Sequence, residues 1–366
     1  MASENYIECK RLLKSFKKKD YWKYFSSADT FLFYLGKKKS LFTFVEQFYN
    51  DSFGCQLFFN NKGFNYVHDI LSTSKENLIT ICDCDSICAI FAPKSDLKDE
   101  EIAYLKKNKI KIMENDNLLI YRFEAGLKER IANVKEIEIL LTNLYYLNSI
   151  IPQEFNDIIE AFKKNDSVVC FMDEKRLEYS VIYRPLPYLE CKIKKEKPNI
   201  QFVEEFKNST YLNDECFFSA SYLPVIIKDK NIRPLIISFY YTKSNRNYFK
   251  YLITTPNEYK NCIFGILYDV FTDVGMPYKI IFNNRYFHAI VENTLNELNI
   301  ENYFERETYV MDNEVSEVLE KIGIDNNTPL DEEITKSTLD SLFDTINEFE
   351  TTNDEIIDIT DEHFVS

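Results

Sequence analysis

Glycine is scarce in this sequence, with only seven among 366 residues. No two lie close enough for a glycine-rich phosphate loop, because the nucleotide-binding fingerprints need at least two glycines within about six residues. P-loop and Rossmann nucleotide-binding domains are therefore excluded. The sequence also lacks an apolar stretch near the roughly 18 residues that span a bilayer. Its start, Met-Ala-Ser-Glu-Asn, is followed by charged residues. We expect neither a membrane span nor a signal peptide.

Residue types that carry catalysis or bind metals are also sparse. The histidines are His68, His288 and His363, and no two have the spacing of a metal-binding pair. No Gly-x-Ser-x-Gly nucleophile elbow occurs. Triads assemble in space, so an enzyme with a site that the sequence does not reveal stays open, with His288 as its candidate base. A packed or solvated helical histidine is the simpler interpretation. We therefore predict no catalytic residues, no metal ligands and no cofactor.

The nine cysteines stand singly in apolar segments. In a chain of this length without an export signal, this pattern is typical of reduced core thiols in a cytoplasmic protein. The densest group is Cys82, Cys84 and Cys88, but a zinc site usually needs a second pair, and none follows. Their even numbers would place all three on one face of an extended strand. A core strand is therefore favoured over a metal site.

Negative charge is concentrated at the C-terminal end. Between Asp325 and Ser366 there are thirteen Asp and Glu residues and one Lys, Lys336, which gives a net charge of −12. The preceding residues therefore carry only −3 of the chain's total of −15. Such a polyanionic tail repels nucleic acids and anionic membranes and is typical of a solubilising or partner-binding appendage.

The tail also contains a helical pattern. Thr328 and Pro329 form a good helix start, and apolar residues then recur at helical spacing. Two interpretations stay open: a helix docked on its own domain, or a helix that binds another protein. If a partner binds, we expect it to contact the apolar stripe of Leu339, Leu342, Phe343, Ile346 and Phe349.

The order of apolar patterns predicts an α+β protein with an N-terminal antiparallel sheet and helices, a mixed second domain and an acidic helical tail. We expect these parts at residues 1–165, 166–310 and 311–366. A long helix is predicted from about Asn133 to Ile150, and a separate one begins at Pro152. The charged stretch Lys192 to Lys197 is the best candidate for an internal linker.

Lysines alternate with aromatic residues near the N-terminus. Nucleic-acid-binding surfaces combine cations for phosphates with rings for bases, but lysines opposite an apolar stripe also occur on any surface helix. The rings fit a docking edge within the protein equally well. Because the folded body is nearly neutral, we consider nucleic acid an unfavoured partner. The residues concerned are Lys10, Lys19, Tyr21, Trp22, Lys23 and Tyr24.

Several segments resemble a group of uncharacterised bacterial proteins with two tandem domains of unknown function. In the second half these are Arg233-Pro-Leu-Ile-Ile237, Gly275-Met-Pro-Tyr-Lys-Ile-Ile281 and Leu295-Asn-Glu-Leu-Asn-Ile300. In the first half they are Gly54-Cys-Gln-Leu-Phe-Phe-Asn-Asn-Lys-Gly63 and Tyr121-Arg-Phe-Glu-Ala-Gly126. The resemblance covers most of residues 20–310 and implies no known activity.

The second half is also similar to the integrase core of ribonuclease-H-like transposases. Such enzymes hold two metal ions between carboxylates at the ends of central strands. The resemblance places Tyr241 and Asn283 at the matching positions, and neither side chain is a carboxylate. We expect the nearby acids Asp269, Asp273 and Glu292 to lie on helices instead. The resemblance therefore implies a degenerate, inactive site, since fold alone does not imply function.

Three functional hypotheses follow from these observations. The leading one is a non-catalytic protein that acts by binding another protein. The second is a degenerate ribonuclease-H-like domain that handles nucleic acids, for example in mobile-element or phage-defence biology, and it predicts salt-sensitive binding to DNA or RNA. The third is an enzyme with an unrecognised site, which predicts clustered ionisable groups in a pocket. The sequence leaves the oligomeric state open.

Overall fold

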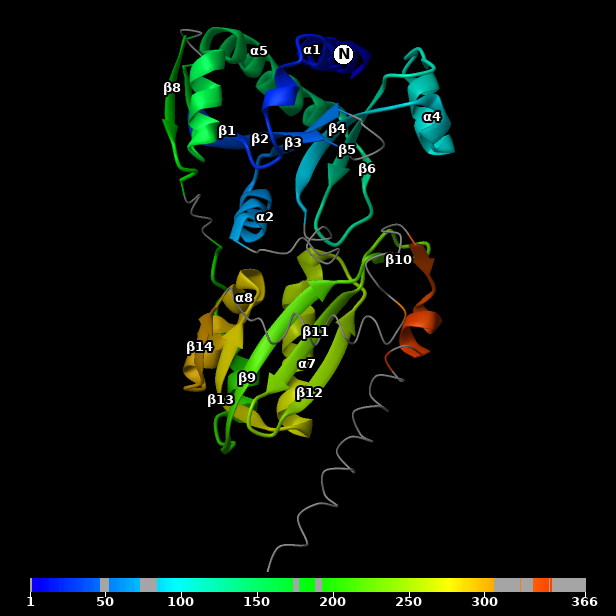
Figure 1. Ribbon diagram of the computed structural model, residues 1–366. Coiled ribbons are helices and arrows are strands. Elements are labelled where there is room, and N and C mark those ends of the chain that lie inside the picture. Colours follow the sequence, from blue (N-terminus) through cyan, green and yellow to red (C-terminus); the bar gives the residue numbers. More distant parts are fainter. Residues whose placement is uncertain are drawn as a thin grey trace, which may run out of the picture. The chain divides into compact units, whose positions relative to one another are not determined.

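The computed structural model describes residues 2–46, 53–72, 84–173, 178–187, 193–305, 323, 332–341 and 343. It confirms the α+β class, since helices and mixed sheets alternate along the chain (Figure 1). The chain forms two compact units. The first contains the chain up to Lys75 together with Cys84–Glu124 and Glu129–Cys191, and the second contains Ala125–Lys128 and the chain from Lys192 onward.

The first unit is built on an eight-stranded sheet. Neighbouring strands are antiparallel, except that β1 and β7 run parallel. Side chains alternate between the faces, so Phe31 and Phe33 enter one cluster of core residues and Leu32 enters another. In spatial order the strands are β6 (Arg130–Ile131), β5 (Asn117–Phe123), β4 (Ser86–Ala92), β3 (Phe53–Phe58), β2 (Lys38–Glu46), β1 (Thr30–Leu35), β7 (Ser167–Asp173) and β8 (Glu178–Arg184).

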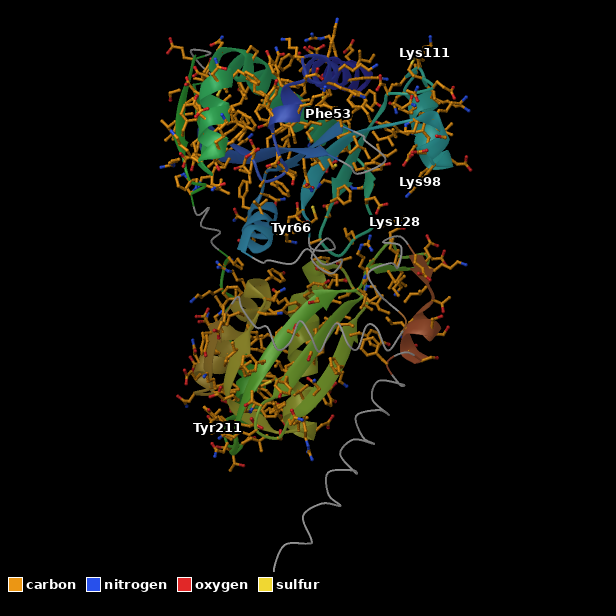
Figure 2. All side chains as sticks on the ribbon, in the orientation of Figure 1. Phe53, Tyr66, Lys98, Lys111, Lys128 and Tyr211 are labelled. Carbon is orange, nitrogen blue, oxygen red and sulfur yellow. The ribbon has the colours of Figure 1, made fainter. Side chains whose placement is uncertain are left out.

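Helices cover both faces of this sheet (Figure 1). Residues of α1 (Ala2–Lys18) and α5 (Val134–Lys163) join the cluster that includes Phe53, which Figure 2 labels. Residues of α2 (Asn61–Ser72) join the other cluster. The remaining helical segments are η1 (Tyr21–Tyr24), η2 (Lys94–Asp96) and α4 (Asp99–Lys107).

The long helix continues through the proline at which we expected a new one. Pro152 lies inside α5, which is a single helix of 30 residues. A proline in a helix removes one backbone hydrogen bond. Apolar residues on both sides of it, including Ile151 and Ile158, are buried in one cluster. Burial of this common apolar face stabilises the continuous helix.

The predicted boundary after residue 165 divides strands of one sheet. The hairpin of β7 and β8, which we assigned to the second domain, belongs to the first sheet because β7 pairs with β1. Local patterns do not show that pairing, since it joins residues far apart in the sequence. The structure places the division at Cys191–Lys192, where the charged linker candidate begins.

The second unit contains a five-stranded sheet in the order β12-β11-β9-β13-β14. The strands β9, β11 and β12 are antiparallel, whereas β13 and β14 run parallel to β9. One face is packed against α6, α7 and α8. The bounds are β9 (Tyr211–Tyr222), β11 (Leu235–Tyr241), β12 (Arg246–Leu252), β13 (Met276–Phe282), β14 (Glu301–Phe304), α6 (Ile200–Phe206), η3 (Pro256–Glu258), α7 (Tyr259–Asp273) and α8 (Arg285–Glu297). A separate pair joins β10 (Val225–Ile227) to β15 (Glu332–Ile334) in parallel.

The short segment Ala125–Lys128 requires glycine at one position. Gly126 has φ of +77°, and an added Cβ would lie 2.4 Å from the Tyr222 ring. The Gly126 carbonyl accepts from the Arg233 N–H at 2.9 Å. Only glycine adopts this conformation beside the ring without strain.

Among the helices of the described residues, none is long and apolar enough to cross a membrane.

Candidate functional site

The end of β13 carries a neutral polar pair. Asn283 follows the last residue of β13, and its Nδ2 donates to Ser219 Oγ on β9 at 3.0 Å. Its Oδ1 accepts from the Ala220 N–H at 3.2 Å, and its own N–H donates to the Phe218 carbonyl at 3.1 Å. Ser219 is only 1% exposed. The amide and the hydroxyl therefore satisfy one another and the strand edge.

The placement of Tyr241 beside Asn283 was wrong. Tyr241 lies at the end of β11, which is antiparallel to β9, and its hydroxyl donates to the Gly275 carbonyl at 2.9 Å. Gly275 precedes β13, whereas Asn283 follows it. Tyr241 pairs with Cys216 of β9, which pairs in turn with Ile280 of β13, three residues before Asn283. Tyr211 of the same strand β9 is labelled in Figure 2. Ser219 occupies the position for which we proposed Tyr241.

Three acidic residues that we expected on helices are bonded to partners of their own. Asp269 and Asp273 lie on α7, as expected, and contact Lys250 Nζ at 3.7 Å and the Tyr248 hydroxyl at 3.0 Å respectively. Glu292 on α8 contacts Lys195 Nζ at 2.5 Å. In the part of the chain that the structure describes, no three His, Cys, Asp or Glu side chains are grouped so as to hold a metal ion.

The candidate base His288 lies on α8 and is half-buried. Its Nε2 is 3.0 Å from Asn302 Oδ1, and its ring packs against Phe282 with centroids 5.3 Å apart. This packing matches the simpler interpretation of His288 as a structural residue. His363 and the side chain of His68 lie outside the described residues.

Two of the three clustered cysteines can be placed. Cys84 and Cys88 are both buried, and Gln56 Nε2 lies 3.2 Å from Cys84 Sγ. Burial raises the pKa of the Cys84 thiol to about 12 and that of Cys88 further. Such thiols stay protonated at neutral pH and are poor metal ligands or nucleophiles. Cys82 lies outside the described residues.

The lysine-rich N-terminal region uses its aromatic rings for internal packing. The rings of Tyr21 and Tyr24 lie 4.9 and 5.4 Å from the Phe155 ring on α5. Lys23 contacts Asp20 at 3.1 Å. These contacts favour the interpretation that the two tyrosines pack within the protein over the interpretation that they stack on nucleic-acid bases.

Part of the acidic tail packs on its own unit. Leu339 and Phe343 are buried in a cluster with Ile236 and Phe249. The Phe343 and Tyr251 rings lie 4.5 Å apart, and the Tyr251 hydroxyl donates to Asp340. For Leu339 and Phe343, the contacts agree with the interpretation that the tail helix docks on its own domain. Leu342, Ile346 and Phe349 lie outside the described residues.

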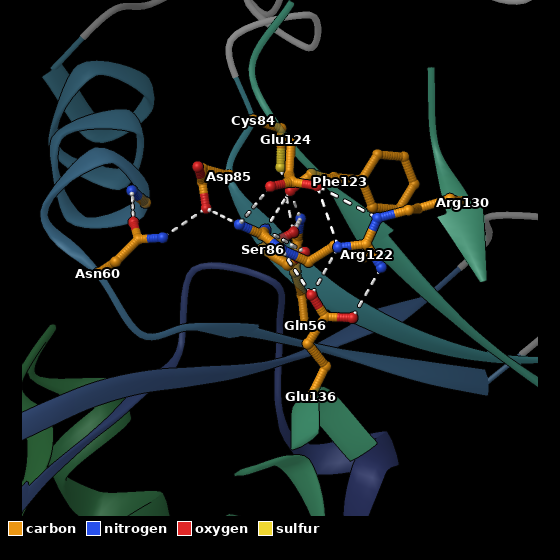
Figure 3. Close-up of polar contacts among 11 residues, drawn as sticks. Gln56, Asn60, Cys84, Asp85, Ser86, Arg122, Phe123, Glu124, Arg130 and Glu136 are labelled. Atoms are coloured by element: carbon orange, nitrogen blue, oxygen red, sulfur yellow. Dashed lines mark hydrogen bonds and ion pairs between the residues drawn. The ribbon is translucent and has the colours of Figure 1, made fainter. Parts of the chain in front are cut away.

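A buried ionic network in the first unit was missed by the sequence analysis (Figure 3). Its centre is Arg122 on β5, which is 5% exposed. Arg122 Nη2 donates to Asp85 Oδ1 at 2.6 Å, and its Nη1 donates to the Ser86 carbonyl at 2.9 Å and to the Phe123 carbonyl. Its Nε lies 3.5 Å from Glu136 Oε1. The sequence feature that could have indicated this network is the position of Arg122 within the mostly apolar strand β5.

The network extends from Arg122 to its surroundings. Arg130 on β6 forms two hydrogen bonds to Glu136, at 2.9 and 2.7 Å. Asn60 Nδ2 donates to Asp85 Oδ1 at 2.6 Å. Glu136 Oε2 also accepts from the N–H of Asn133, whose side chain in turn caps the start of α5. The network therefore joins β4, β5, β6 and the beginning of α5.

Electrostatics explain why Glu136 can stay ionised here. Burial favours the neutral acid, but hydrogen bonds from Arg130 and from the Asn133 N–H, together with the charges of Arg130 and Arg122, lower its pKa overall. The guanidinium nitrogens of Arg122 all face protein acceptors. The network therefore links secondary-structure elements inside the unit, and the Arg122 guanidinium is not oriented to bind a ligand.

Comparisons with known proteins place this network within a recognised domain. Residues 8–175 match the model of a family described as "Domain of unknown function (DUF7309)". The match confirms that the first half contains a domain of unknown function. No curated protein matches the chain.

Among solved structures, one match is described as "CryoEM structure of simian T-cell lymphotropic virus intasome in complex with PP2A regulatory subunit B56 gamma". It has 14% sequence identity, a TM-score of 0.23, and covers 34% of this chain. The chain spans about half, 47%, of the length of that protein chain. A likeness at this TM-score supports no conclusion about fold or function.

We predict that Arg122→Met lowers the free energy of unfolding by about 3–5 kcal/mol. The reason is that the Asp85 and Glu136 side chains stay buried but lose the positive charge that compensates them. The control is Arg130→Met, since the Arg130 side chain is 42% exposed, and its cost should be about 1 kcal/mol. Urea unfolding followed by circular dichroism measures both. Equal effects of the two variants would contradict a special role for Arg122.

We also predict a specific pH dependence. Glu136 has a folded pKa below its ordinary value of 4.5, so its ionised form stabilises the fold above that value, and the contribution is lost as the pH falls through the lowered pKa. Between about pH 5 and pH 3, the melting temperature of the unmodified protein should fall more than that of Glu136→Gln. The control is the exposed Glu138→Gln on the same helix, which should follow the unmodified protein. Parallel curves for all three proteins would refute the prediction.

Proposed function

We propose that the protein is non-catalytic and acts by binding another protein, and that its second unit is a ribonuclease-H-like scaffold without the metal-binding carboxylates. The strand order β12-β11-β9-β13-β14 supports this proposal, with three consecutive antiparallel strands followed by two strands parallel to the first. A ribonuclease-H-like domain has the same order and the same strand directions.

The observation that carries the proposal is the pairing of Asn283 with Ser219. In a ribonuclease-H-like nuclease, carboxylates at the ends of the first and fourth strands clamp two metal ions. Here β9 and β13 are those strands, and they carry a hydroxyl and an amide bonded at 3.0 Å. Neither group supplies negative charge, and both are engaged in holding the two strands together.

Several features favour a protein partner over nucleic acid. Strand order by itself also suits a domain that handles nucleic acids, but fold does not determine function. The tail from Asp325 to Ser366 carries a net charge of −12 and repels phosphates. Leu339 and Phe343 anchor the start of this acidic region on the second unit. A basic protein surface is the partner chemistry that complements such an anchored polyanion.

We expect no binding of Mn²⁺ or Mg²⁺ to the second unit of the unmodified protein. The matched comparison is Ser219→Asp/Asn283→Asp, which places two carboxylates side by side and should acquire Mn²⁺ binding, because the cation relieves their repulsion. Isothermal titration and the metal-induced rise in melting temperature measure both proteins. Tight Mn²⁺ binding by the unmodified protein that is lost in Asn283→Ala would overturn the non-catalytic proposal.

The acidic tail should determine partner binding. A chain that ends at Phe343 keeps the buried anchor, and we expect it to lose the protein that the full-length chain captures. The matched control keeps the tail length and replaces its Asp and Glu residues after Phe343 with Asn and Gln. Quantitative affinity capture followed by mass spectrometry compares the three chains. Equal recovery of the same proteins on all three would show that the tail is not the contact.

A further inference from the structure

The strand β8 ends the first sheet and offers its outer edge for pairing. It lies at the outer end of the eight-stranded order, and among the described strands only β7 pairs with it (Figure 1). The register with β7 is continuous from Glu178 to Arg184. The strand contains no proline and no bulge, which are two of the features that protect an edge strand from pairing with another chain.

Exposed apolar side chains flank this edge. Phe171 on β7 and Ile182 on β8 are each 40% exposed. The Tyr34 ring on β1 stacks on Phe171 with centroids 4.9 Å apart. The other side of β8 is held in place, since the Tyr183 hydroxyl donates to Glu154 on α5 at 3.2 Å and Tyr179 donates to Gln153. A fixed backbone edge beside exposed apolar residues is typical of an interaction site.

The sequence of β8 is complementary to itself. We propose that the occupant of this edge is a second copy of the chain, paired antiparallel through β8 about a two-fold axis at Val181. In that register Glu178 of each copy faces Arg184 of the other. Tyr179 faces Tyr183, and Ser180 faces Ile182. Two ion pairs and two aromatic pairs form at once, and a two-fold interface requires such self-complementarity.

The charges also select the register. Sliding the copies by two residues places Glu178 opposite Ile182 and removes both ion pairs. A one-residue slip moves the side chains to the wrong face of the sheet. In the selected register, Ile182 and the neighbouring Phe171 of both copies gather on one face, where their association removes apolar surface from water. The pairing joins two eight-stranded sheets edge to edge.

The test uses full-length protein and charge reversal. The unmodified chain should form a concentration-dependent dimer in sedimentation velocity. Glu178→Arg and Arg184→Glu should each weaken it by about tenfold or more, because like charges then face each other. An equimolar mixture of the two variants should dimerise again, since each mixed pair restores both opposite-charge contacts. Circular dichroism checks that both variants are folded.

A further variant probes the apolar flank independently of the ion pairs. Ile182→Lys introduces a charge at an exposed position and should abolish the dimer while leaving the melting temperature nearly unchanged. The matched control is Ile200→Lys, at an exposed position in the second unit, which should dimerise like the unmodified chain. A chain that is monomeric at every concentration, or a dimer that survives all three β8 variants, would overturn the proposal.

Discussion

A charge or polar group removed from water must find a partner inside the protein, and both central sites of this chain obey that constraint. In the first unit Arg122 is buried with Asp85 and Glu136, so the charges compensate one another. In the second unit the buried Ser219 is bonded to Asn283, and no charge is present that needs compensation. The first solution joins several secondary-structure elements, and the second joins β9 to the residue that follows β13.

The parallel pairing of β1 with β7 has consequences beyond the core. It requires a long connection, which the chain supplies through the intervening strands and α5. The buried hydroxyls of Thr30 and Ser167 lie 2.6 Å apart where this pairing begins. Because β7 brings β8 with it, the sheet ends in a strand whose charge pattern is self-complementary. The proposed association of two copies therefore depends on how the sheet is completed.

The two units differ in what they carry beside their sheets. The first has a buried ionic network and, at β8, the edge for which we propose pairing with a second copy. The second has a sheet whose face opposite α6, α7 and α8 receives Leu339 and Phe343 from the acidic tail. Leu339 and Phe343 hold this part of the acidic region on the second unit, and the proposed partner is a basic protein surface.

Local signals in the sequence were sufficient for the α+β class, for the start of a long helix near Asn133 and for the apolar spacing of Leu339 and Phe343. Each depends on side chains a few residues apart. The sequence also predicted Asn283 at the end of a strand, where the structure has it. Only the tertiary structure showed that Ser219, not Tyr241, lies beside it, and that Arg122 finds partners on β4 and α5. Strand pairing and burial join residues as distant as Thr30 and Ser167, whose separation of 137 positions exceeds the range of any local pattern.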